Sequence, residues 1–229
     1  NPGADAFAQE LKKVSARKIP VIASMFGSDP NDFERMTKLF DSAGAVAFEL
    51  NLSCPHVKGV GTEVGHDPHL VAAIVKAVRK STSKPVFAKV SPGMETMLQT
   101  VKAAEEAGAS GITATNTIRA MAIDVESRVP YLSNRFGGLS GDALHPIAVR
   151  CVYEIAEQTK IPIIGCGGID SWEDAVEFIL AGASAVEIGT VLAYRPPTVI
   201  EEILSGIRGY MTRKGYKRVS DFVGLAHSR

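Results

Sequence analysis

The chain has 229 residues, enough for one large domain, and its 25 basic residues balance its 25 acidic ones. This balance offers no electrostatic basis for binding nucleic acid or an anionic membrane surface, so we expect neither partner. No apolar run approaches the length of a membrane-spanning helix. The three cysteines show neither disulfide nor metal-ligand spacing, which predicts a cytoplasmic protein with no structural disulfide and no metal site.

Two kinds of short motif alternate along the chain and mark where strands begin. Ala-Gly-Ala triplets end helical stretches, because glycine suits the left-handed position that follows a helix. Runs that start with Pro20, Pro85 and Pro162 begin the other strands. Together the motifs predict strands at about 20–26, 46–51, 85–90, 111–115, 161–165 and 185–189. Helical patterns lie near 4–16, 30–43, 67–80, 94–107, 142–159, 171–181 and 196–214.

Short apolar strands that alternate with helices predict a parallel sheet. Polar or small residues follow every one of these strands, which favours a (β/α)8 TIM barrel over an open sheet with a single switch point. Only six strands are predicted, and the chain opens at Asn1-Pro2-Gly3 without a methionine. We therefore expect one α/β barrel domain over residues 1–229, with the first two barrel strands absent from this chain.

The segment 49–56 follows the apolar run at 45–48 and reads Glu-Leu-Asn-Leu-Ser-Cys-Pro-His. It places Asn51 and Cys54 where a strand ends and a loop begins, and parallel α/β folds build their active sites at that edge. A thiol at this position can act as a base or a nucleophile. The alternative is that Cys54 is a small buried hydrophobic residue.

Glycines cluster after the last two predicted strands, in Gly165-Cys166-Gly167-Gly168 and in Gly189-Thr190. Glycine lets backbone N–H groups approach an anion, and a helix that begins just after the loop adds a favourable dipole. This pair of loops predicts a phosphate site, which could hold flavin mononucleotide or a phosphorylated substrate. Tight turns alone are the alternative explanation for the glycines.

Three polar residues stand out at the ends of the middle strands. Lys89 interrupts an otherwise apolar strand, which is costly unless the ammonium group is paired or faces an anion. Asn116 and Thr117 follow the next strand and offer the amide and hydroxyl groups that a polar planar ligand requires. A surface lysine and a turn cap are the alternative readings.

Taken together, these motifs resemble class 1 of the dihydroorotate dehydrogenase family, in order and across nearly the whole chain. The resemblance is carried by the segments Asn51–Pro55, Lys89–Pro92, Thr115–Thr117, Phe136–Gly141, Gly165–Ile169 and Ile188–Thr190. It implies a flavin mononucleotide (FMN) enzyme of pyrimidine biosynthesis that oxidises dihydroorotate to orotate. Cys54 would be the base that takes a proton from the substrate ring, and the loop 56–65 would be a mobile lid.

The resemblance also implies roles for the other residues. The substrate would be bound by Asn51, Asn116, Thr117 and His56. The flavin would be held by Ser24, Lys89, Gly141, Gly167, Gly168, Gly189 and Thr190.

One departure from the class 1 pattern keeps a second reading open. His56 stands where that class commonly has asparagine, and Cys-Pro-His resembles the flavin domain of dihydropyrimidine dehydrogenase, which acts on uracil and thymine. The segment 122–128 instead resembles the NAD-linked, two-subunit branch of dihydroorotate dehydrogenases. That branch implies a homodimeric core and an iron–sulfur flavoprotein subunit with FAD. The iron–sulfur centre would belong to that second subunit, because this chain has no cysteine cluster of its own. A third reading comes from a different class of enzyme, in which the chain is a barrel isomerase or lyase whose glycine loops bind the phosphate of the substrate.

Overall fold

The computed structural model describes residues 2–52, 64–92 and 96–228. All six predicted strands are present: β1 (Ile22–Met25), β2 (Ala47–Asn51), β3 (Val86–Val90), β4 (Gly111–Ala114), β9 (Ile163–Cys166) and β10 (Ala185–Glu187). They form one sheet in the order β1-β2-β3-β4-β9-β10. The pairs β1–β2, β2–β3 and β9–β10 are parallel, which confirms the predicted parallel sheet for these strands.

The helices also follow the prediction, with ends that differ by a few residues. They are α1 (Ala4–Ser15), α2 (Pro30–Ser42), α3 (Pro68–Ser81), α4 (Met97–Glu106), α5 (His145–Ala156), α6 (Trp172–Ala181) and α7 (Val199–Lys214). Short 3-10 turns add η1 (Val64–His66), η2 (Asp142–Leu144), η3 (Thr190–Ala193), η4 (Val219–Asp221) and η5 (Leu225–His227). Within the described ranges, no helix is both long enough and apolar enough to cross a membrane.

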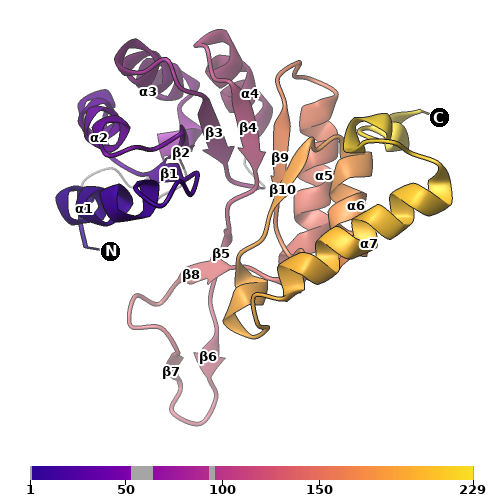
Figure 1. Cartoon of the computed structure of the whole chain (residues 1–229). Helices are drawn as coiled ribbons and strands as arrows, with labels where there is room; N and C mark the ends of the chain where they lie inside the picture. The colour runs from indigo at the N-terminus through magenta and orange to yellow at the C-terminus, as the bar shows by residue number, and fades with distance from the viewer. Residues whose placement is uncertain (1, 53–63, 93–95, 229) are drawn as a thin grey trace. The chain divides into compact units, whose positions relative to one another are not determined.

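The chain divides into two compact units, which we describe separately. The first unit comprises Asn1–Val90, Met94–Thr113 and Glu157–Pro162. In it α2 packs on β1, and α3 and α4 pack on β3, so that helices cover one face of the strands (Figure 1). Phe33, Phe48 and Ile74 are fully buried between these layers. Burial of the apolar helix faces against the strands is the main source of stability in this arrangement.

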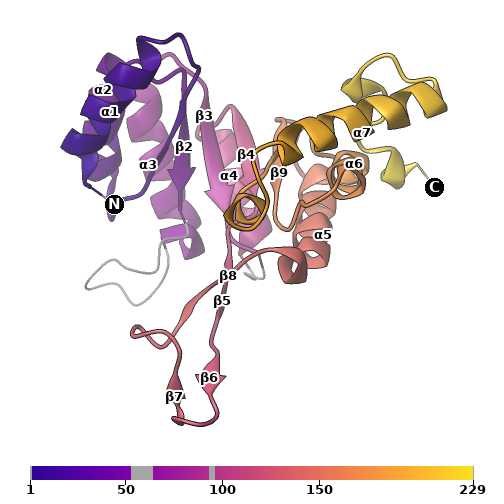
Figure 2. The same ribbon diagram turned by 60° about the horizontal axis from the view of Figure 1, so that its bottom comes forward.

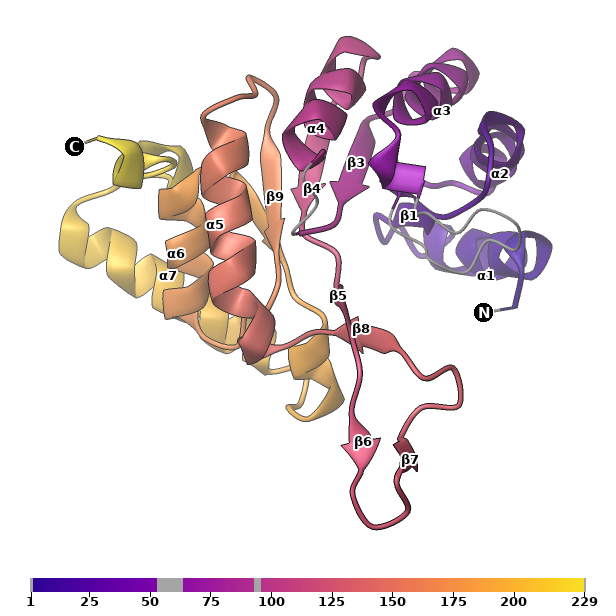
Figure 3. The same ribbon diagram turned by 180° about the vertical axis from the view of Figure 1, so that it is seen from behind.

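The second unit comprises Ser91–Gly93, Ala114–Ala156 and Ile163–Arg229. Here α5 packs on β9, and α6 contacts β10 and lies between α5 and α7 (Figure 3). Ser171 caps α6 through a capping box with Asp174, which starts this helix directly after the β9 loop. The close packing of α7 on α6 requires Gly206, because a Cβ atom there would lie 2.1 Å from Trp172 Cγ.

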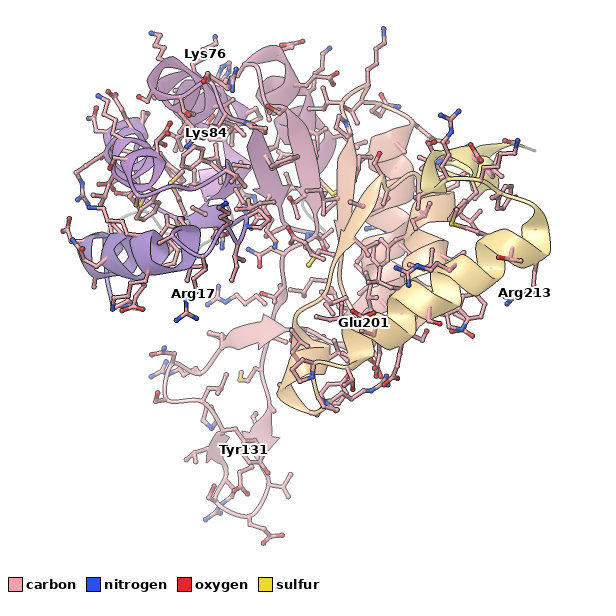
Figure 4. All side chains as sticks on the ribbon, in the orientation of Figure 1. Arg17, Lys76, Lys84, Tyr131, Glu201 and Arg213 are labelled. Atoms are coloured by element: carbon pink, nitrogen blue, oxygen red, sulfur yellow. The ribbon has the colours of Figure 1, made fainter. Side chains whose placement is uncertain are left out.

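Two short antiparallel ribbons, which the sequence patterns did not predict, occupy the segment between β4 and α5. The strands are β5 (Ile118–Ala120), β6 (Ile123–Asp124), β7 (Val129–Pro130) and β8 (Gly137–Leu139). β5 pairs with β8 and β6 with β7, and the ribbons extend away from α5, α6 and α7 within the second unit (Figure 2). Tyr131, labelled in Figure 4, is 69% exposed on this extension.

Candidate active site

In the first unit, three polar side chains from three neighbouring strands meet on one face of the sheet. The Ser24 hydroxyl donates to Glu49 Oε1 at 2.9 Å, and Lys89 Nζ lies 3.4 Å from the same oxygen. The carboxylate is 7% exposed and the lysine side chain 15%. The predicted cost of placing Lys89 in an apolar strand is therefore offset by a buried ion pair with Glu49.

The strand register explains why these residues meet. Ser24 of β1 lies opposite Glu49 of β2, and Asn51 of β2 lies opposite Lys89 of β3. Because side chains alternate along a strand, Glu49 and Asn51 point to the same face. The structure thus places Ser24, Asn51 and Lys89 on one face of three neighbouring strands and adds Glu49, whose role the sequence patterns did not reveal.

We expect the substitution Glu49→Gln to lower the free energy of unfolding by about 1–3 kcal/mol, because it removes the carboxylate charge that faces the buried Lys89 ammonium. The glutamine can still accept the Ser24 hydrogen bond, so the change isolates the charge. Urea unfolding of the two proteins measures the difference.

The control is Glu106→Gln, which removes the carboxylate of the Lys102–Glu106 pair at the surface, where both side chains are more than two-thirds exposed (76% and 68%). It should change stability by no more than about 0.5 kcal/mol. Equal effects from the two substitutions would show that the Glu49–Lys89 pair contributes no more than a surface pair.

In the second unit, the segment after β4 is held against β9. The amide of Thr115 donates to the carbonyl of Cys166 at 2.7 Å, and the Thr115 side chain is buried. Thr117 packs directly on β8, because a Cβ atom at Gly138 would lie 2.3 Å from Thr117 Oγ1. Asn116 Oδ1 accepts from the Thr117 amide at 2.9 Å. Gly138 therefore sets the place of the Thr117 hydroxyl, a contact that sequence reasoning missed.

The predicted glycine loops come together in the second unit. Gly168, with φ of 64°, lies so close to Gly141 that a Cβ atom would be 2.6 Å from the Gly141 carbonyl oxygen. A Cβ atom on Gly141 would in turn lie 3.5 Å from Thr190 Cγ2. Gly167 has φ of 144°, outside the range that L-residues usually adopt. Gly189 has open space around its Cα, with no heavy atom within 4 Å of a Cβ placed there.

These loops form what we call the glycine cradle, the backbone of Gly141, Gly167, Gly168, Gly189 and Thr190. The loop of Gly168 approaches the Gly141 carbonyl at backbone distance because glycine has no side chain there, and Gly141 lies beside the Thr190 methyl group. α6 follows one of these loops, so its amino-terminal dipole favours a negative charge nearby. Such a cradle can hold a phosphate group through backbone N–H donors.

Cys54 and His56 lie outside the described residues.

A parallel α/β sheet with glycine loops after its last two strands is the arrangement in which (β/α)8 barrels frequently bind phosphate groups. The family profile described as dihydroorotate dehydrogenase matches residues 1–211. The chain belongs to this family.

Comparison with curated relatives shows which branch of the family this chain resembles. The chain is 49% identical over 226 residues to "Dihydroorotate dehydrogenase B (NAD(+)), catalytic subunit" of Pyrococcus furiosus, covering 99% of this chain and 75% of the relative. It is 46% identical to the protein of the same name from Thermococcus kodakarensis (99% and 74% covered). The Methanosarcina mazei protein of that name is 44% identical (99% and 72% covered). The predicted resemblance to the NAD-linked branch is confirmed.

A solved structure confirms the predicted fold class. The dihydroorotate dehydrogenase of Eimeria tenella, solved in complex with ferulenol, superposes with a TM-score of 0.81 at 24% sequence identity. The match covers 99% of this chain and 69% of that chain. At this identity the likeness concerns the fold, an α/β barrel, and the site roles rest on the residues described above.

Proposed function

We propose that this chain is the catalytic subunit of a two-subunit enzyme that oxidises dihydroorotate to orotate in pyrimidine biosynthesis. The identity of 43–49% to curated catalytic subunits, over 99% or more of the chain, is the observation on which we rest this proposal. The predicted site residues support it, because they would supply a base, amide groups and an anion cradle. Each of these groups has a part in the reaction.

The cofactor that fits the described residues is FMN. The glycine cradle suits a phosphate monoester, since Gly189 has open space beside it and glycine lets backbone N–H groups approach an anion. Gly141, Gly167, Gly168, Gly189 and Thr190 would hold that phosphate. Lys89 would contact the flavin ring, with its charge balanced by Glu49 at 3.4 Å, and Ser24 would contribute a polar contact. When bound, the flavin supplies a hydride acceptor.

The remaining predicted residues would act on the substrate. Asn51, Asn116 and Thr117 would hold the ring amide and carbonyl groups of dihydroorotate, for which their side chains offer both donors and acceptors. His56 would contribute a ring nitrogen. Cys54 would remove a proton from one ring carbon, and the neighbouring carbon would lose its hydride, so that a carbon–carbon double bond forms. A thiol suits this step because its pKa of about 8.5 is close to neutral pH.

We further propose that electrons leave through an iron–sulfur subunit that carries FAD, that the catalytic subunits form a homodimer, and that the enzyme works in the cytoplasm. The names of the relatives describe NAD-linked catalytic subunits, and such a subunit has a partner. This chain has three cysteines without cluster spacing, so an iron–sulfur centre would belong to the partner.

The visible absorption spectrum of the purified full-length protein tests the cofactor and the substrate class together. We expect a yellow protein that releases FMN on denaturation and whose flavin spectrum shifts on titration with orotate. A colourless protein that takes up no FMN would support the isomerase or lyase reading. Tighter binding of uracil than of orotate would support the dihydropyrimidine dehydrogenase reading.

A further inference from the structure

An ion-paired bridge links two of the three segments of the glycine cradle, the loop of Gly167 and Gly168 and the loop of Gly189 and Thr190. Asp170 follows Gly167 and Gly168, and Arg195 follows η3, which begins at Thr190. Arg195 Nη1 donates to both the Asp170 carbonyl oxygen at 2.9 Å and Asp170 Oδ1 at 2.8 Å. Tyr194 adds a second contact, since its hydroxyl donates to Asp170 Oδ2 at 3.0 Å. One aspartate thus receives side chains from two consecutive residues of the other loop.

Both ends of the bridge are fixed to regular structure. The Asp170 amide donates to Asp174 Oδ2 at 3.0 Å, in the first turn of α6. The Arg195 amide donates to the carbonyl of Val191 in η3 at 2.9 Å, and its guanidinium also pairs with Glu202 of α7. Movement of one cradle loop relative to the other would therefore break several charge-assisted bonds at once.

The positive charge of Arg195 is paired with carboxylates of the protein itself. Its guanidinium lies between the carboxylates of Asp170 and Glu202, and the hydrogen bond to Asp170 raises the arginine pKa above its ordinary value. Asp174, on the other side of Asp170, is desolvated by burial, yet hydrogen bonds from the Asp170 and Ser171 backbone and from the Ser171 hydroxyl leave its pKa below the ordinary value. Arg195 and Asp174 are therefore both charged at neutral pH.

We propose that Arg195 is a positioning residue for phosphate binding, which holds the loop of Gly167 and Gly168 at the spacing from Gly189 and Thr190 that a phosphate requires. It acts through Asp170 and donates to no phosphate itself. This inference rests on the proposed FMN function and adds to it the group that keeps the cradle in shape. A preorganised cradle binds its anion without paying the ordering cost of two loops at the moment of binding.

The test compares FMN with riboflavin, which has the same ring and lacks the phosphate. Flavin is removed from the full-length protein, and the dissociation constants of both ligands are measured by fluorescence quenching for the parent and for Arg195→Met. We expect FMN affinity to fall about tenfold or more, the scale of losing a charged hydrogen bond. Riboflavin affinity should change less than about twofold, because the ring contacts remain.

Two further variants separate geometry from charge and from general damage. Arg195→Lys keeps a positive charge opposite the two carboxylates but cannot reach Asp170 and Glu202 with one planar group, so FMN affinity should still fall several-fold. Arg150→Met is the matched control, because the Arg150 side chain is 56% exposed and pairs with Glu154 of the same helix, α5. It should bind both ligands as the parent does.

Three results would overturn the inference while the parent still binds FMN. They are parental FMN affinity in Arg195→Met, parental affinity in Arg195→Lys, and an equal loss of FMN and riboflavin affinity in Arg195→Met. The first removes the bridge from binding, the second assigns the effect to charge alone, and the third assigns it to the fold. A parent that binds no FMN would instead contradict the proposed function, and this inference with it.

Discussion

Replacing Cys54 with serine is expected to slow reduction of the bound flavin by dihydroorotate at least about 100-fold at neutral pH, the usual scale of losing a general base. A serine hydroxyl is a far weaker base than a thiol near pH 7, while the two side chains are similar in size. FMN binding should be unchanged, because no role in holding the cofactor falls to this residue. Stopped-flow absorbance in the absence of oxygen measures the rate.

Cys151→Ala is the control for this experiment. Cys151 lies in α5 with its side chain fully buried, so its removal changes packing and leaves the proposed chemistry intact. We expect the parental reduction rate, with some loss of thermal stability. If Cys54→Ser reduced its flavin at the parental rate, Cys54 would be a packing residue and the base would lie elsewhere.

The second large effect concerns the glycine cradle. Gly168→Ala places a methyl group 2.6 Å from the Gly141 carbonyl oxygen and forces a non-glycine residue to φ of 64°. Overpacking and left-handed strain together cost about 2–4 kcal/mol, so the loops must separate to accept the methyl group. We expect FMN affinity to fall about 100-fold, measured as the dissociation constant for FMN.

Gly215→Ala is a matched control for the backbone strain alone. Gly215 ends α7 with φ of 77°, and a Cβ atom there would meet no heavy atom within 4 Å. The substitution carries the same left-handed penalty without the steric contact, so it should lower stability and leave FMN affinity unchanged. Similar FMN affinities for both variants would show that the contact of Gly168 with Gly141 does not shape a phosphate site.

Most of the regular elements could be predicted from the sequence, because each strand is an apolar run with a glycine or proline at its start. The ribbons between β4 and α5 could not. Each of their strands has only two or three residues, too short for an alternating pattern to appear. For the turn between β6 and β7 the sequence does offer a signal, the aspartate Asp124, a residue type that favours turns. In the structure Asp124 Oδ1 accepts hydrogen bonds from the amides of Glu126 and Ser127.

In the candidate site, too, some features could be predicted from the local sequence, whereas others depend on contacts between residues far apart in the chain. The need of Lys89 for a partner was evident from its apolar strand, because a lone buried charge is unstable. That the partner is Glu49 depends on how β1, β2 and β3 align, which no local pattern specifies. The Asp170–Arg195 bridge joins residues 25 positions apart and is likewise visible only in the folded chain.

The reaction of the FMN-loaded full-length protein with dihydroorotate under anaerobic conditions tests the central claim most directly. We expect the flavin absorbance near the visible maximum to bleach and orotate to appear in proportion to the flavin reduced, while dihydrouracil leaves the flavin oxidised. A flavin that stays oxidised with dihydroorotate, or that is bleached by dihydrouracil instead, would contradict the assignment of this chain as a dihydroorotate-oxidising catalytic subunit.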